Sequence, residues 1–379
     1  MRVQGGRVVA QGWLWLCLLG AGCDRGAVAE PSVTLAQRAT TESQSTEQRA
    51  ASSPPAEVDH EGLLIGEFRL AANPVVDGDT VRVEGIDGSI RLLCLDTEEK
   101  IRSNADRTAI RRDFDRYLEQ KRGGSARPKK AATPMGDAAS AFAREFFEGV
   151  ETVRLERDDP EEIRGRYGRL LAYVFAKKNG RWTSYNVECV RAGMSPYFTK
   201  YGYSRRFHNE FALAEAEARE AKRGIWNPAS QGYGDYDERK AWWNARADFI
   251  RAFEHEANRR DDYVELGHFD AEQALEAKLG QEVTVLGTVD RIRKFSSLVR
   301  VSLVGHRTAN VPLIFRDHAI FRESDVARYQ GEPITARGLV ERYEKGDYRT
   351  LQIEVHQPSQ ISLPTLPWPS EETKSIDVR

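Results

Sequence analysis

Two short stretches decide the fold: PVVDGDTVRV at residues 74–83 and IRLLCLDTEE at residues 90–99. Both look like apolar strands interrupted by carboxylates, and Arg91 stands within the second. Alternate side chains of a strand face opposite ways, so Arg91 would lie among apolar neighbours, where an unpaired charge is costly. We therefore expect Arg91 to have acidic partners. The nearby carboxylates are Asp77, Asp79, Asp96, Glu98 and Glu99.

The chemistry of these acids points towards phosphate. Asp79, Asp96 and Glu99 offer the oxygen ligands that a hard cation such as Ca²⁺ uses, and no soft ligands accompany them. Clustered carboxylates repel one another unless a cation or arginines neutralise them. Carboxylates, arginines and a divalent ion together suit phosphoryl transfer. A purely structural network of ion pairs is the alternative interpretation at this point.

Length and composition limit the number of domains and the overall charge. The chain has 379 residues, enough for about two domains. Its formal net charge is −2, from 56 basic and 58 acidic residues. The overall charge thus argues neither for nor against a polyanionic partner, and any basic surface must be local.

The first 23 residues resemble an export signal. Arg2 and Arg7 precede the short apolar run WLWLCLLGAG, which ends in small residues before Cys23. We expect residues 1–23 to be a signal peptide with a lipid-modified Cys23, which predicts an exported bacterial lipoprotein anchored to a membrane, either periplasmic or on the cell surface. Ordinary cleavage and secretion is the alternative. Residues 24–60 are rich in Ser, Thr, Ala, Gln, Glu and Pro, which predicts a disordered linker.

Cysteine and histidine chemistry is not indicated. Beyond the signal region only Cys94 and Cys189 remain, in apolar contexts that favour buried free thiols. None of the seven histidines falls in the charged motifs.

Residues 61–228 read as a small β-barrel with packed helices. Expected strands surround residues 74–83, 90–99 and 152–157, and a hairpin over 169–182 turns at KKNG. Expected helices cover 137–149, 184–194 and 208–226. The basic insertion at about 100–135 is either a solvated charge run or a flexible cationic flap beside an anionic substrate.

The second half has a different pattern. We expect a helical connector over 229–270, with an amphipathic helix at 237–260 whose aromatic stripe serves packing. Residues 271–363 show five strands with a helix after the third, the order of an OB-fold barrel. Basic and aromatic residues such as Arg291, Phe295 and Arg300 mix on its adjoining strands. Residues 364–379 are expected to be a disordered tail.

Taken together, the charged motifs resemble the staphylococcal (micrococcal) nuclease family, from about Leu63 to Trp226. VVDGDTVRV resembles its first acidic motif, IRLLCLDTEE its Arg-Leu-x-x-x-Asp-Thr-Pro-Glu motif, and GRYGRLLAYVF its Tyr-Gly-Arg hairpin. The resemblance implies a mainly β fold with helices, in which a five-stranded OB-fold-type nuclease barrel precedes the second, OB-like barrel.

The resemblance also implies a Ca²⁺ site. Asp79 and Asp96 match the carboxylates that bind the ion, and Thr97 matches the residue that gives it a backbone carbonyl. Asp77 matches an outer acidic position. Glu98 departs from the family, which usually has proline there.

The remaining matched residues imply catalysis and substrate binding. Arg91 and Arg169 match the guanidinium groups that clamp the scissile phosphate, and Glu99 matches the proposed general base. Arg166 and Tyr201 fall where side chains contact the nucleotide, whereas Thr199 replaces a second tyrosine.

The expected function is therefore a Ca²⁺-dependent nuclease, secreted or lipid-anchored, that hydrolyses DNA and RNA with little sequence preference and a 5′-oxygen leaving group. We expect a monomer. The alternative is a non-catalytic nucleic-acid-binding or adhesion protein built on nuclease-like and OB modules. Degenerate copies of this domain lose the acids and arginines, so their presence here favours the enzyme.

Overall fold

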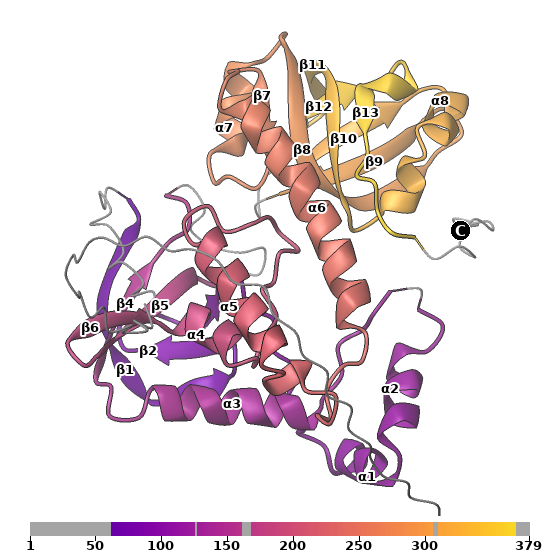
Figure 1. Ribbon diagram of the computed structural model, residues 1–379. Coiled ribbons are helices and arrows are strands. Elements are labelled where there is room, and N and C mark those ends of the chain that lie inside the picture. The colour runs from indigo at the N-terminus through magenta and orange to yellow at the C-terminus, as the bar shows by residue number, and fades with distance from the viewer. Residues whose placement is uncertain (1–61, 126, 161–167, 306–309, 369–379) are drawn as a thin grey trace, which may run out of the picture. The chain divides into compact units, whose positions relative to one another are not determined.

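The computed structural model describes residues 62–125, 127–160, 168–305 and 310–368 (Figure 1). The expected signal peptide, Cys23, the linker up to residue 60 and Arg166 lie outside the described residues. The rest forms a mixed β and α fold with two separate sheets.

The first sheet has the strand order β3-β2-β1-β4-β5-β6. An additional β3–β5 pairing closes the first five strands into a barrel, as the resemblance implied, and β6 extends it. The β5–β6 turn contains Asn179 and Gly180 at φ 50° and 79°, which suits the expected Asn-Gly hairpin. The strands are β1 (Leu64–Asp77), β2 (Thr80–Val83), β3 (Ile90–Leu92), β4 (Thr152–Glu156), β5 (Leu171–Lys178) and β6 (Arg181–Ser184).

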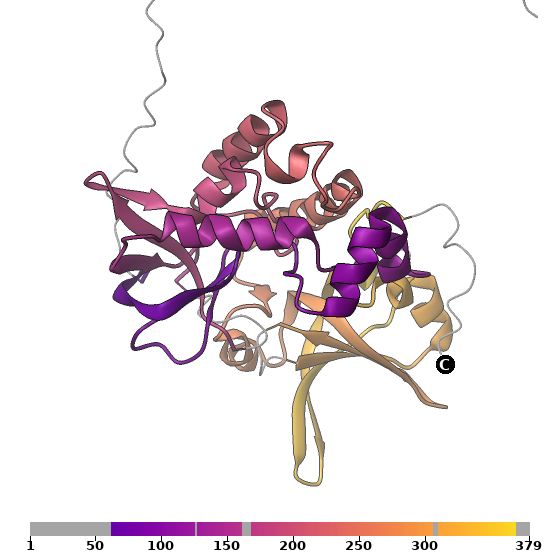
Figure 2. The ribbon, with the colours of Figure 1, turned by 90° about the horizontal axis from the view of Figure 1, so that it is seen from below.

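Three helices pack on this barrel: α3 (Pro134–Phe146), α4 (Tyr185–Arg191) and α5 (His208–Glu220). The Thr133 side chain caps α3 by accepting from the amide of Gly136. Figure 2 shows α3 running across the barrel strands. Its Phe146 contacts the buried ring of Tyr185 on α4, with ring centroids 5.0 Å apart. Apolar burial between these layers therefore fixes the helices against the sheet.

Much of the insertion is helical, unlike the flexible flap that was one of its two interpretations. It contains α1 (Asn104–Arg112) and α2 (Phe114–Arg122), and the longest described stretches outside helices lie between α2 and residue 133. Ser103 and Asp113 cap the two helices. Ile110 and Tyr117 are buried in a cluster that includes Tyr236, which explains why so charged a segment is ordered.

The long helix α6 (Tyr236–Ala257) agrees with the expected amphipathic helix. Its Trp243, Ile250 and Phe253 are buried, so the aromatic stripe does serve packing. Lys240 Nζ donates to the carbonyl of Tyr197, 2.8 Å away. The helix thus joins residues that follow α4 to the second sheet, where Ile250 and Phe253 pack with Leu286.

The second sheet has the order β13-β11-β12-β10-β9-β8-β7, and a β11–β8 pairing closes strands β8 to β12 into a barrel. The expected five strands are present, with α8 (His318–Glu323) after the third, while β7, β13 and α7 (Ala271–Ala277) were not expected. The β11–β12 hairpin projects from this barrel in Figure 2. The strands are β7 (Tyr263–Glu265), β8 (Glu282–Lys294), β9 (Val299–Val304), β10 (Asn310–Phe315), β11 (Pro333–Lys345), β12 (Tyr348–Glu354) and β13 (Ile361–Ser362).

The start of the expected disordered tail is ordered. Leu366 is buried, and the indole of Trp368 packs edge-on against Tyr329 at 5.6 Å between ring centroids. Two large apolar side chains gain enough from burial to hold residues 364–368 on the barrel. Residues 369–379 lie outside the described residues. None of the helices in the described ranges has the length and apolar character that crossing a bilayer requires.

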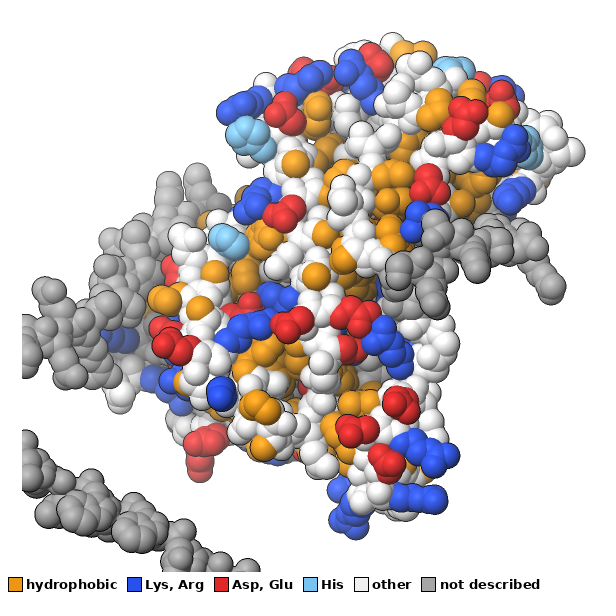
Figure 3. Space-filling view, turned by 45° about the vertical axis from the view of Figure 1, so that its right-hand side comes forward, with side chains coloured by type: hydrophobic (Ala, Val, Ile, Leu, Met, Phe, Trp, Pro, Cys, Tyr) orange, Lys and Arg blue, Asp and Glu red, His pale blue; other side chains and the backbone are white. Residues whose placement is uncertain are grey.

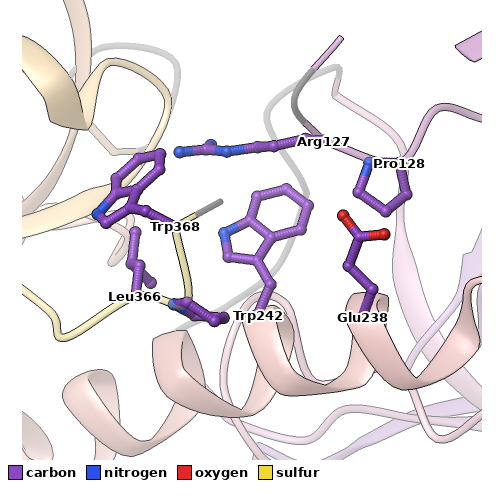
Figure 4. Close-up of a pocket in the computed structure, with 7 residues that line it drawn as sticks. Arg127, Pro128, Glu238, Trp242, Leu366 and Trp368 are labelled. Carbon is purple, nitrogen blue, oxygen red and sulfur yellow. The ribbon is translucent and has the colours of Figure 1, made fainter. Parts of the chain in front are cut away.

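A buried carboxylate connects three of these segments. Glu332, immediately before β11, is fully buried and forms ion pairs with Arg127 of the insertion and Arg246 of α6. Trp242 also donates to it, with Nε1 3.3 Å from Oε2. Figure 4 shows the Arg127 guanidinium beside the indoles of Trp242 and Trp368. The three segments are therefore tied through one acidic side chain.

We expect Glu332→Ala to destabilise the protein by about 3–5 kcal/mol, because it leaves two arginines without their buried partner. The free energy of unfolding in urea measures this. Glu323→Ala, an exposed change on α8, is the control and should stay within about 0.5 kcal/mol of the wild type. Equal stability of the two variants would contradict a structural role for Glu332.

Candidate active site

Arg91 lies between two buried carboxylates. Strand register places Thr80 of β2 opposite Arg91 of β3, so the preceding residue, Asp79, is within reach of the guanidinium. Arg91 forms ion pairs with Asp79 and with Asp96, the latter with Nη2 3.0 Å from Oδ1. Its Nη2 also donates to the carbonyl of Leu95 at 2.9 Å. The expectation that Arg91 has acidic partners is thus confirmed for Asp79 and Asp96.

Burial makes these charges interdependent. Asp79 is 3% exposed and Asp96 is 7% exposed. Burial raises the pKa of Asp79, and the nearby Arg91 guanidinium offsets only part of that rise. Burial acts to lower the pKa of Arg91, but the Asp79 and Asp96 carboxylates outweigh it and raise that pKa. Each carboxylate therefore depends on positive charge close by.

The main chain around the two acids is tightly fixed. A Cβ on Gly78 would lie 2.7 Å from side-chain carbons of both Ala139 and Thr97, so only glycine fits there. The hydroxyl of Tyr185 donates to the Gly78 carbonyl at 2.7 Å. The Thr97 amide donates to Asp79 Oδ2 at 3.1 Å. These contacts hold the two acidic motifs against each other and beside α3 and α4.

The third predicted acid, Glu99, lies at the surface side of the pair. Its side chain is 49% exposed, and its Oε1 is 3.6 Å from Nζ of Lys130. The same ammonium lies 2.6 Å from Asp96 Oδ1. Asp77 accepts from the Asp79 amide at 3.3 Å. Sequence reasoning missed Lys130, which is one of many basic residues in the insertion.

Glu98 anchors the insertion, a role that its replacement of the usual proline did not reveal. It is 1% exposed and accepts from the Thr133 hydroxyl, from the Tyr233 amide at 2.8 Å and from the Tyr236 hydroxyl at 2.7 Å. Burial raises the pKa of Glu98, although these three donors counteract it. Glu98 thereby connects the end of the insertion to the start of α6.

The other positions considered in the sequence are Arg169, Tyr201 and Thr199. Arg169 is half-buried, and the carbonyl of the next residue, Leu170, accepts from the Arg91 amide at 2.9 Å. Arg169 therefore begins the segment that runs beside β3. Tyr201 is 73% exposed, as suits a side chain available for stacking. Thr199 is buried and donates to Asn244 on α6, so it is not available to a nucleotide.

Lys200, next to Tyr201, was also missed by sequence reasoning. Burial lowers the pKa of Lys200 to about 8, and the positive charge of Arg246 acts in the same direction. Its Nζ lies 5.1 Å from the Trp242 ring centroid. An ammonium in this setting is held by an aromatic face rather than by an acid.

The donor set suits a hard cation. Asp79 and Asp96 both pair with one guanidinium, and both offer carboxylate oxygens, the ligand type that Ca²⁺ prefers. Among the residues that the structure describes, no group of three or more His, Cys, Asp and Glu side chains is arranged to hold a metal ion.

The second barrel carries the expected mixture of basic and aromatic groups. Arg293 of β8 pairs across the strands with Arg300 of β9, whose Nη2 donates to the Tyr348 hydroxyl at 2.9 Å. Phe295 is half exposed. On the face of the molecule in Figure 3, basic and acidic side chains are interspersed, in keeping with the nearly balanced net charge.

We expect Glu98→Ala to destabilise the fold by about 3 kcal/mol, because it leaves buried donors of Thr133, Tyr233 and Tyr236 without an acceptor. Urea unfolding measures the change. The matched control is Glu119→Ala on α2, an exposed glutamate whose replacement should have almost no effect. A Glu98 variant as stable as the control would show that the anchor contributes nothing.

Lys200 should give stability a pH dependence. Its folded-state pKa of about 8 lies below its ordinary value, so the unfolded chain binds the extra proton and stability rises as pH rises through this interval. We expect the stability of the wild type relative to Lys200→Met to increase from pH 7 to pH 10 in urea titrations. Replacing the exposed Lys177 by methionine should give a difference that stays flat with pH. A flat difference for Lys200→Met as well would argue against its burial in charged form.

Comparison with known proteins supports this assignment of motifs. A family model described as staphylococcal nuclease homologue matches residues 90–228. An uncharacterized protein, MJ1439 of Methanocaldococcus jannaschii, is 32% identical over 162 residues, which cover 40% of this chain and 69% of that protein. Endonuclease YncB of Bacillus subtilis is 26% identical over 155 residues, or 58% of its length. The SPbeta prophage-derived endonuclease YokF of the same species is 26% identical over 42% of its length.

The two relatives named endonuclease are thus covered over only about half of their length. The match with MJ1439 exceeds two thirds of that protein, and the matching family model spans Arg91, Asp96 and Glu99. The chain therefore belongs to the staphylococcal nuclease homologue family.

Proposed function

We propose that this protein is a Ca²⁺-dependent nuclease that hydrolyses phosphodiester bonds of DNA and RNA with little sequence preference. The observation that supports this most is the Arg91 guanidinium between the buried Asp79 and Asp96. A network of that kind with a merely structural role would not need Glu99 at the exposed side of the same cluster. The relatives named endonuclease favour the same activity.

In this proposal each residue of the site has a separate role in hydrolysis. Arg91 binds nonbridging oxygens of the scissile phosphate, and Arg169 stabilises the added charge on phosphorus and the departing 5′-oxygen. Glu99, half exposed, accepts the proton of the attacking water. Ca²⁺ held by Asp79, Asp96 and the Thr97 carbonyl would supply further positive charge to the phosphate oxygens.

Substrate binding requires little base recognition. The exposed ring of Tyr201 offers a face on which a base can stack, and it stands next to Lys200. Arg166 is proposed as a further nucleotide contact on the basis of the motif alone, since it lies outside the described residues. Stacking and phosphate contacts do not distinguish bases, which supports activity on both DNA and RNA.

We also propose that the protein is exported as a monomer and anchored to a bacterial membrane by lipid at Cys23. Only the sequence of residues 1–23 supports the export and the anchor, and ordinary secretion remains the competing outcome. Metabolic labelling with a fatty acid, compared between the wild type and Cys23→Ala, separates the two.

The decisive experiment is digestion of plasmid DNA and of RNA, with Ca²⁺ or with a chelator. We expect cleavage only with Ca²⁺. Arg91→Ala and Glu99→Ala should each lower the rate by about 10²–10³-fold, because each removes a group that acts in the transition state.

Matched controls keep that experiment interpretable. Arg82→Ala on β2 and Glu84→Ala just after it alter exposed residues of the same charge and should digest like the wild type. Thermal melting checks that Arg91→Ala is folded, and Glu99→Gln serves as a second variant at an exposed position. Full turnover by folded Arg91→Ala, or by both Glu99 variants, would refute the assigned roles. Binding of nucleic acid without cleavage in Ca²⁺ would favour the non-catalytic alternative.

A further inference from the structure

A lysine of the insertion, outside the motifs that resemble the family, contacts the acidic cluster. Lys130 belongs to the insertion, and its Nζ lies 2.6 Å from Asp96 Oδ1 and 3.6 Å from Glu99 Oε1. The same Oδ1 also accepts from Arg91. The proposed function assigns the Asp96 carboxylate to a divalent ion. One of its two oxygens is therefore already shared by Arg91 and Lys130.

The position of Lys130 is built into the fold. The Tyr233 hydroxyl is 2.7 Å from the Ala131 amide and 2.6 Å from its carbonyl. Ala132 forms a β-bridge with Glu99, and its carbonyl accepts from the Tyr117 hydroxyl at 3.0 Å. The Thr133 amide donates to the Glu99 carbonyl at 3.0 Å. The three residues after Lys130 are thus fixed beside the cluster, so its side chain starts within reach of Asp96.

A divalent ion would be the third positive charge at Asp96, after Arg91 and Lys130. Each carboxylate oxygen has few lone pairs, and every added cation raises the repulsion where burial limits screening, so binding of the ion favours the departure of one of the side chains. The Lys130 side chain is 43% exposed, so it has room to move towards solvent when an ion arrives. Arg91 is far less free to move, because its side chain is only 19% exposed and also bonds to Leu95.

We propose that Lys130 occupies the cation position at Asp96 when no ion is bound, so that Ca²⁺ must displace it, and that this competition sets the affinity for the ion. The inference rests on the proposed function only in assigning Asp79 and Asp96 to the ion. It makes Lys130 a positioning residue of the insertion that determines how much Ca²⁺ the protein needs.

Calorimetric titration of the full-length chain with Ca²⁺ alone, without nucleic acid, tests the proposal. We expect Lys130→Met to bind Ca²⁺ about tenfold more tightly than the wild type, which corresponds to about 1.4 kcal/mol. Lys130→Arg keeps the competing charge and should stay near the wild type. Thermal melting without the ion confirms that each variant is folded.

The matched control is Lys129→Met. Lys129 is the exposed neighbour, and its replacement removes the same charge one residue away. If Lys129→Met tightens binding as much as Lys130→Met, general electrostatics accounts for the effect and the proposal fails. It also fails if Lys130→Met binds Ca²⁺ no more tightly than the wild type, or if neither protein binds the ion.

The outcomes separate this inference from the proposed function. Tighter Ca²⁺ binding by Lys130→Met, together with no digestion of nucleic acid by the wild type, would support the competition and refute the nuclease. Equal binding by all variants, together with Ca²⁺-dependent digestion, would refute the competition and leave the nuclease intact. Binding that is detected only in Lys130→Met would also support the competition.

Discussion

Two carboxylates buried beside each other need positive charge, and this electrostatic requirement organises the centre of the protein. Asp79 and Asp96 come from motifs on either side of the β2–β3 pairing, and Arg91 neutralises both. The strand register, the glycine at position 78 and the hydroxyl of Tyr185 all serve to hold that arrangement. Without the arginine, burial would favour the protonated acids, and neither a cation nor a phosphate would find a charged partner there.

The insertion supplies a second positive charge to these carboxylates through Lys130. Family members are recognised by motifs that this chain shares, yet here an additional segment brings Lys130 to Asp96 and Glu99. The glutamate that replaces the usual proline binds the end of that segment to the residues before α6. Glu98 and Lys130 thus have complementary roles. Glu98 holds the insertion in place, and Lys130 is the charged side chain that the insertion brings to Asp96.

Much of the fold could be predicted because its signals are local. Apolar runs bounded by turn residues located β2 and β5, the Asn-Gly pair located the β5–β6 turn, and helical periodicity located α3 and α6. The charge of Arg91 within an apolar strand predicted its acidic partners. The insertion was harder, since α1 and α2 are short, highly charged helices whose stability comes from burying Ile110 and Tyr117 against distant residues. The same limit hid Lys130, Glu98 and Lys200, because their partners are distant in sequence and only the folded chain brings them together.

The contacts of Tyr233 and Tyr236 determine how far a fragment must extend to keep the native site. Both residues lie beyond position 228, where the family match ends, yet they hold Ala131 and Glu98 in place. A fragment that ends at residue 228 would keep every recognised motif and lose these contacts to the insertion. The smallest piece that preserves the native centre therefore extends into α6, so the first turn of the connecting helix is structurally part of the first barrel's site.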